Sequence, residues 1–175
     1  MERTEEKLGN TLMSELYRRL GEPTMSRDSG SSGRFNLKNG RGICEAEGGL
    51  EYTLPDGTQI NHRWDVLIHV TGGKKMAVEL KFLSSVTDQF KARAYDAAHT
   101  KKKYGDSVYC VLGYLRFQTG LSIKAAKSYC YSFDEFIGVE LNRPEDVIAS
   151  LGKLADALEG IVDKLGSPRV TTTSA

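Results

Sequence analysis

Apolar positions follow helical spacings near the two ends of the chain. In residues 4–20, leucines recur every fourth residue, which places them on one face of a helix. In residues 144–165, apolar side chains step alternately by four and three, which is a heptad seam on a second long helix. Such a seam either packs on its own domain or serves a homodimer through this C-terminal helix.

The middle of the chain follows strand spacings that are interrupted by glycine turns. The stretch "EYTLPDGTQINHRWDVLIHVTGGKKMAVELKF" (residues 51–82) predicts three strands joined by two hairpins. Residues 84–105 have helical spacing and end at a glycine, and residues 107–115 are nearly all apolar, as in a strand buried on both faces. A short helix around 121–128 and a strand near 129–133 precede the C-terminal helix.

This order of elements (helix, three antiparallel strands, helix, strand) predicts an α/β or α+β sandwich in which helices cover a mixed central sheet. The length of 175 residues suits one domain. We place that domain at residues 1–166, with a core over 4–116 and a C-terminal addition over 117–166. Residues 167–175 are predicted to be a disordered tail, and residues 22–49, rich in glycine and serine, a long loop.

Composition and charge exclude several classes of protein. No apolar run approaches the length of a membrane span, and the N-terminal "MERTEEKLGN" is too charged for a secretion signal. The three cysteines have no metal-ligand spacing, so we interpret them as reduced thiols of a cytoplasmic protein. The sequence contains no zinc pattern, phosphate-binding glycine loop or Ser-His-Asp set. With a net charge of +1, any basic surface has to be local.

Charged residues interrupt the second and third predicted strands at positions that share one face. Because side chains alternate along a strand, Glu79 and Lys81 point to the same side, away from the apolar face. A three-residue Thr-Gly-Gly loop pairs Val70 with Lys74, and therefore Asp65 with Glu79. Directly opposed carboxylates repel, so a bound cation or full hydration has to compensate.

The first predicted strand adds further acids to this face. The Pro-Asp-Gly loop pairs Glu51 with Asn61, which puts Glu51 on the same side as Asp65. If the strand continued undistorted, Glu47 would lie opposite Asp65, although the two glycines that follow Glu47 favour a bulge there. Trp64 is assigned to the opposite, apolar face and to the core.

Two carboxylates beside a lysine suit one kind of chemistry. Oxygen ligands favour magnesium, manganese or calcium, and magnesium is commonly held by one or two carboxylates together with a substrate phosphate. Lys81 can hold a water or stabilise the negative charge that develops in phosphodiester hydrolysis. A solvated strand face is the alternative, but helices on both sides of the sheet leave little room for it. His69 shares the face of Asp65, whereas we interpret His62 as structural or exposed.

Asp65, a hairpin, and Glu79-Leu80-Lys81 within "MAVELKF" resemble the PD-(D/E)XK nuclease superfamily, and the predicted elements over residues 4–116 match its α-β-β-β-α-β order. The resemblance implies a restriction-endonuclease-like fold and a magnesium site, with manganese as a substitute. Asp65 and Glu79 would be the metal carboxylates, and Lys81 the catalytic lysine. The backbone carbonyl of Leu80 would be a further metal ligand. The family often has proline before the first acid, where this chain has tryptophan.

The resemblance also implies a third acid, and the chain offers residues for contacts with DNA. Candidates for the acid are Glu15, Glu47 and Glu51, of which we favour Glu47 because of its alignment with Asp65. The predicted DNA contacts come from the glycine-serine loop and from the helix after the third strand: Arg27, Arg34, Arg41, Gln89 and Arg93. An ordinary mobile loop and a solvated helix face are the alternatives for these two groups.

We therefore expect a magnesium-dependent DNA endonuclease, with a restriction enzyme as the first choice. One alternative is a structure-specific nuclease that cuts four-way junctions, or a repair nuclease. Another is a nucleic-acid-binding module that kept the fold and lost the chemistry. The intact set of Asp65, Glu79 and Lys81 argues against that last alternative.

Overall fold

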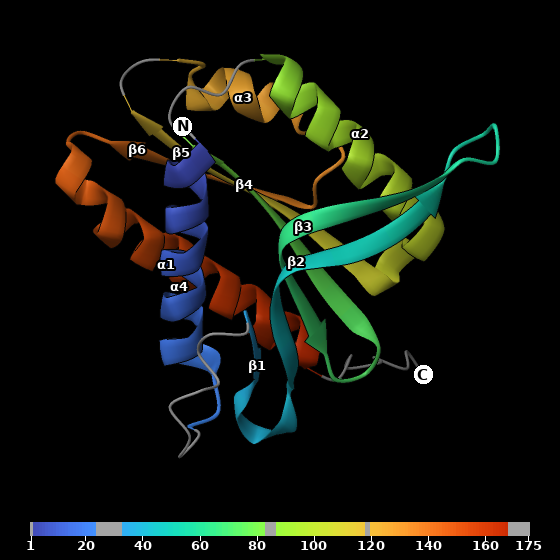
Figure 1. Ribbon diagram of the computed structural model, residues 1–175, viewed down its shortest axis with the longest axis horizontal. Helices are drawn as coiled ribbons and strands as arrows, with labels where there is room; N and C mark the ends of the chain where they lie inside the picture. Colours follow the sequence, from blue (N-terminus) through green and yellow to red (C-terminus); the bar gives the residue numbers. More distant parts are fainter. Residues whose placement is uncertain (1, 24–32, 83–86, 118–119, 168–175) are drawn as a thin grey trace, which may run out of the picture.

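The computed structural model describes residues 2–23, 33–82, 87–117 and 120–167, and it places helices on both faces of one sheet (Figure 1). None of the helices in these parts of the chain is long and apolar enough to cross a membrane. The elements, with 3₁₀ helices marked η, are in chain order α1 (Glu2–Leu20), β1 (Arg34–Asn36), η2 (Lys38–Gly40), β2 (Gly42–Thr53), β3 (Gln59–Val70), β4 (Lys74–Phe82), α2 (Thr87–Tyr104), η3 (Gly105–Ser107), β5 (Val108–Phe117), α3 (Ile123–Tyr129), β6 (Glu135–Leu141), η4 (Pro144–Asp146) and α4 (Val147–Gly166).

The described strands form one six-stranded sheet in the order β1-β2-β3-β4-β5-β6. Neighbours from β1 to β4 run antiparallel, whereas β5 is parallel to β4, and β6 is parallel to β5. The pairing becomes parallel where α2 connects β4 to β5, because two parallel neighbours need a crossover between them. The predicted mixed sheet covered by helices is confirmed, and α1, β2, β3, β4, α2 and β5 follow the predicted α-β-β-β-α-β order.

One face of the sheet is covered by α1 and α4, and the other by α2 and α3 (Figure 1). The heptad seam of α4 is buried inside the chain itself, in one apolar cluster with the leucines of α1 and the sheet. The structure therefore shows the intramolecular alternative for this seam, and a homodimer stays a prediction. The seam residues buried in this cluster are Leu151, Leu154, Leu158 and Ile161.

Parts of the sheet differ from the prediction. Both β1 and the first eight residues of β2 lie inside the segment predicted to be a loop. Three residues are too few to show an alternating pattern, and the glycines at the start and middle of β2 conceal its strand pattern. The strand predicted near 129–133 is wrong: α3 extends to Tyr129, residues 130–134 form a turn, and pairing with β5 begins at Glu135. The Asp134 side chain accepts a hydrogen bond from the Cys110 N–H at 2.7 Å, which fixes the turn against β5 just before β6 begins. The predicted tail, apart from Ser167, lies outside the described residues.

The two hairpins have the predicted registers. Val70 pairs with Lys74 across the β3–β4 loop, and Glu51 pairs with Asn61 across β2 and β3. Gly73 has a φ of 82°, the left-handed conformation expected for the last residue of this three-residue loop. Loop length alone therefore sets which residues of β3 and β4 face each other.

The β2–β3 hairpin changes faces halfway along its length, which the alternation of side chains does not predict. Glu47 has a φ of 52° and no pairing partner, and the ladder resumes on either side of it. Beyond this point Trp64 packs with Leu50 beneath α2, whereas Val66 packs beneath α1 and α4. The prediction that Trp64 shares a face with Val66 is therefore wrong, although Trp64 is core. The left-handed residue rotates the hairpin about its own axis.

Candidate active site

The structure brings Asp65, Glu79 and Lys81 together on the side of the sheet that faces α2. The last pair of the β3–β4 ladder is Val66 with Val78. One residue further along, the carboxylate of Asp65 reaches across to β4 and accepts a hydrogen bond from the Leu80 N–H at 2.6 Å. The two strands therefore remain joined at this point by a side chain, which fixes Asp65 against the strand that carries Glu79 and Lys81.

Glu79 is the centre of the site. Its side chain is only 3% exposed, and its Oε1 lies 3.1 Å from the Lys81 ammonium and 2.6 Å from Nε of Arg93 on α2. The other oxygen, Oε2, is buried without a hydrogen bond and lies 3.5 Å from Nε2 of His62. A buried carboxylate oxygen without a hydrogen bond is costly, so this oxygen is available to a further ligand.

Three residues connected to Glu79, directly or through Arg93 and His62, were not assigned to the site from the sequence: His62, Asp96 and Tyr52. His62 Nδ1 lies 3.4 Å from Asp96, and Tyr52 donates a hydrogen bond from its hydroxyl to Asp96 at 2.8 Å. Asp96 was detectable as the residue one turn beyond Arg93 on the same helix face. His62 and Tyr52 had no local signal, because the change of face at Glu47 is what turns them towards α2.

The electrostatics of the two acids differ. Burial, with the nearby charge of Glu79 as the second cause, raises the pKa of Asp65 to about 6, because two cations and a backbone N–H offset only part of the increase. Burial also acts to raise the pKa of Glu79, but neighbouring His62 and the cations Lys81 and Arg93 outweigh it and hold that pKa below its usual value. Glu79 is thus ionised at neutral pH. For Asp65, the neighbouring cations do not offset the cost of burying its negative charge.

These donors fit a magnesium ion. Two carboxylates of different strands and the Leu80 carbonyl are oxygen ligands, the type magnesium prefers, and waters or a phosphate supply the remaining positions. Among the described residues no group of three Asp, Glu, His or Cys side chains is arranged to hold a metal.

Glu47, the favoured third acid, keeps the predicted register opposite Asp65, since Ala46 pairs with Val66 and Gly48 with Trp64, but its side chain turns away. Its side chain is 73% exposed and lies 3.7 Å from the guanidinium of Arg63. The left-handed conformation that changes the face of the hairpin also turns this carboxylate away. Of the other candidates, Glu15 pairs with arginines on α1, on the opposite side of the sheet, and Glu51 is exposed on β2. The third acid stays a prediction.

The predicted DNA contacts are dispersed. Arg93 lies in the site itself, and Gln89 is exposed one turn earlier on α2. Arg34 is exposed on β1, whereas Arg41 forms an ion pair with Asp163 of α4 at 2.5 Å. Arg27 lies outside the described residues. His69, which shares the strand parity of Asp65, instead contacts Glu45 on β2 at 3.0 Å.

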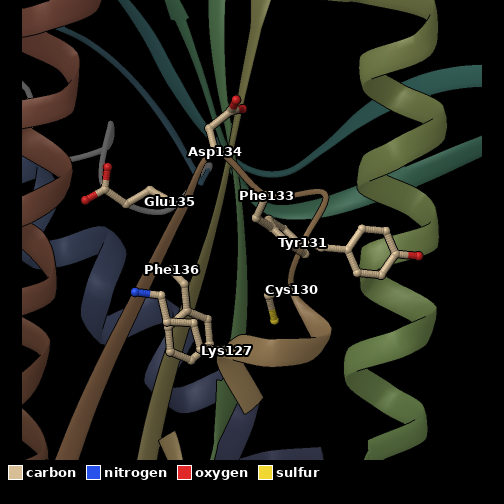
Figure 2. A pocket seen from close by; sticks show the side chains of 7 residues that line it. All are labelled: Lys127, Cys130, Tyr131, Phe133, Asp134, Glu135 and Phe136. Carbon is tan, nitrogen blue, oxygen red and sulfur yellow. The ribbon is translucent and has the colours of Figure 1, made fainter. Parts of the chain in front are cut away.

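A separate hollow lies at the start of β6, beside α3, with a cavity volume of about 460 Å³ (Figure 2). Phe133 and Phe136 line it, and its two carboxylates are already engaged. Asp134 accepts hydrogen bonds from the Cys110 N–H of β5 and from the Lys101 ammonium of α2, and Glu135 accepts one from the Tyr109 hydroxyl at 3.0 Å. This hollow contains none of the predicted catalytic residues, so we do not assign the site to it.

Comparisons with known proteins locate the chain only loosely. No protein-family model and no curated protein matches it. Among solved structures, the chain is similar to EndoMS in its dsDNA2 complex, with a TM-score of 0.34 and 21% identity over 54% of this chain and 37% of that one. It is also similar to the small subunit (R.BspD6I2) of the heterodimeric restriction endonuclease R.BspD6I, with a TM-score of 0.34 and 12% identity over 70% of this chain and 68% of that one. The chain spans little more than a third of the EndoMS chain. Scores this low support no conclusion about function, which has to come from the site.

Proposed function

We propose that this protein is a magnesium-dependent DNA endonuclease, with a restriction-type enzyme as the first choice and manganese as a substitute ion. One observation supports it above all others: Asp65, Glu79 and Lys81 meet on one face, and Glu79 offers a buried oxygen without a hydrogen bond. A solvated strand face, the alternative raised by the sequence, does not fit side chains this deeply buried.

Each residue has a distinct role in this proposal. Asp65, Glu79 and the Leu80 carbonyl would hold the ion, which when bound would acidify a water and neutralise a phosphate. Lys81, fixed by Glu79 at 3.1 Å, would orient the attacking water or stabilise the charge that develops on the phosphate. Arg93 lies at the solvent side of the site with its side chain 35% exposed, where it can reach a phosphate.

The test is metal-dependent cleavage of supercoiled plasmid, short duplexes and a four-way junction, with magnesium or manganese. Lys81→Ala and Asp65→Asn are compared with wild type, and Lys153→Ala and Asp106→Asn serve as matched controls. Lys153 and Asp106 are exposed residues on α4 and η3. We expect discrete products from wild type and both controls, and none from the two site variants.

The substrates separate the alternatives. Cleavage of duplexes at defined positions supports the restriction type, and cleavage confined to the junction supports the structure-specific nuclease. Binding of DNA without cleavage under any metal would favour the binding module that lost its chemistry. If the protein neither binds nor cleaves nucleic acid and shows no saturable metal binding, the nuclease proposal is rejected.

A further inference from the structure

Glu79 belongs to a closed ring of four charged or polar side chains, which we call the Glu79 ring: Glu79, Arg93, Asp96 and His62. Arg93 bridges the two acids, with Nε 2.6 Å from Glu79 Oε1 and Nη1 3.2 Å from Asp96 Oδ2. His62 bridges them from the other side, at 3.5 Å from Glu79 and 3.4 Å from Asp96. Each acid therefore has the same two neighbours.

The charges around the ring conflict with a bound divalent ion. In the described structure Asp65, Glu79 and Asp96 carry three negative charges when ionised, and Lys81 and Arg93 carry two positive ones. A divalent ion on Asp65 and Glu79 would bring two more positive charges beside both cations. Because like charges a few ångströms apart repel strongly in a partly buried site, a divalent ion at the free Oε2 would weaken the attachment of the two cations that share Oε1.

Arg93 is the cation that can withdraw. Lys81 is only 11% exposed and extends from the same strand as Glu79, so it has little freedom to leave. Arg93 is 35% exposed, extends from α2, and already contacts a second acid with its other nitrogen. That acid is anchored, because the Tyr52 hydroxyl of β2 donates to Asp96 Oδ1 at 2.8 Å.

We propose that Arg93 is an exchangeable counter-ion: it neutralises Glu79 in the metal-free protein and is taken over by Asp96 when a divalent ion binds. Asp96 is then a positioning residue for Arg93, held in place by Tyr52 and His62. The inference rests on the proposed function, since it needs a metal on Asp65 and Glu79. It also explains why an arginine is tolerated against a carboxylate that a metal requires.

The proposal predicts effects of opposite sign on metal affinity. Arg93→Gln removes the competitor from Glu79 and should tighten manganese binding, on the order of tenfold. Asp96→Asn removes the negative charge that attracts Arg93 and should weaken manganese binding by a similar factor. In the double variant, Asp96→Asn should have no further effect, because it acts through Arg93. If the charge of Asp96 acted on the metal directly and not through Arg93, the two single effects would add.

The experiment is calorimetric titration of manganese into the full chain without DNA, for wild type, both single variants and the double variant. Lys102→Gln, which removes an exposed cation from the same helix, is the matched control and should leave the affinity unchanged. Circular dichroism and thermal melting confirm that each variant is folded. If Arg93→Gln does not fold, Asp96→Asn alone still tests the predicted loss.

The outcomes separate this inference from the proposed function. If wild type binds manganese and Arg93→Gln binds it equally or more weakly, Arg93 is not a counter-ion that the metal replaces, and only this inference fails. Additive effects in the double variant would reject the role of Asp96. If wild type binds no manganese at all, the metal-dependent function itself fails.

Discussion

The two faces of the sheet are built differently. The face under α1 and α4 is one continuous apolar cluster, whereas the face under α2 and α3 holds two smaller clusters. The charged side chains buried in the described structure are Glu79 and Lys81, and both lie on this second face. The buried imidazole of His62 lies there too. The apolar residues of this face form one cluster around Trp64 and another around Phe90, and Phe133 packs against both.

This difference shows how the molecule divides stability from chemistry. Burial of apolar area stabilises a fold in proportion to the area, so the continuous cluster supplies most of the stability. Burial of charges costs free energy even when they are paired, so the interrupted face is less favourable for folding. A fold retains such a group where the group performs a function, and strongly perturbed carboxylates are a common sign of one.

The largest effect is expected from Glu79→Gln, which removes the charge at the centre of the interrupted face. Cleavage should fall by about 10³-fold, and the free energy of unfolding by about 3 kcal/mol, because Lys81 and Arg93 lose their shared partner. Plasmid cleavage and urea unfolding measure the two. Glu145→Gln, an exposed glutamate of η4, is the control. Full activity in Glu79→Gln would exclude Glu79 as a metal ligand.

The continuous face should respond in stability alone. Leu154→Ala leaves a cavity between α4 and the sheet and should lower the free energy of unfolding by roughly 3–4 kcal/mol. Cleavage per folded molecule should be unchanged. Ile148→Ala, 68% exposed on the same helix, should change stability by no more than about 0.5 kcal/mol. A loss of specific activity in Leu154→Ala would show that the two faces are not independent.

The raised pKa of Asp65 predicts how stability depends on pH in metal-free buffer. With a folded-state pKa of about 6 against 3.8 when unfolded, the folded protein binds this proton more tightly, so the carboxyl becomes destabilising as pH rises through that range. Asp65→Asn should therefore gain about 2–3 kcal/mol over wild type between pH 4 and pH 7.5. Urea unfolding in chelator measures this gain, with Asp106→Asn as control. A difference that is independent of pH would contradict the raised pKa.

The smallest effect is expected for Arg41, predicted from the sequence to contact DNA and found beside Asp163. A partly exposed ion pair contributes little, so Arg41→Ala should cost about 0.5–1 kcal/mol of stability. DNA affinity at fixed salt, measured by fluorescence anisotropy, should change less than about twofold. If DNA binding by Arg41→Ala depended less on salt than binding by wild type, with unchanged stability, Arg41 would be a DNA contact as the sequence predicted.

Much of the fold and the centre of the site were predictable because they depend on local pattern. The helices at both ends follow from the spacing of their leucines, and the β3–β4 register follows from a three-residue loop. That register is what places Asp65 beside Glu79. The short strand β1 and the position of β6 were missed, since three residues carry no period and the start of β6 depends on how Asp134 binds to β5.

The sequence by itself determined the order of the core elements α1, β2, β3, β4, α2 and β5, the mixed sheet and the meeting of Asp65, Glu79 and Lys81. These follow from periodicity and loop length, which act between residues close in the chain. Only the tertiary structure decided that Glu79 is enclosed by Arg93 and His62, and that Glu47 is turned outward. Those contacts depend on left-handed Glu47, which rotates the β2–β3 hairpin, and on α2, which packs over β4. Neither is encoded in the pattern of any single strand.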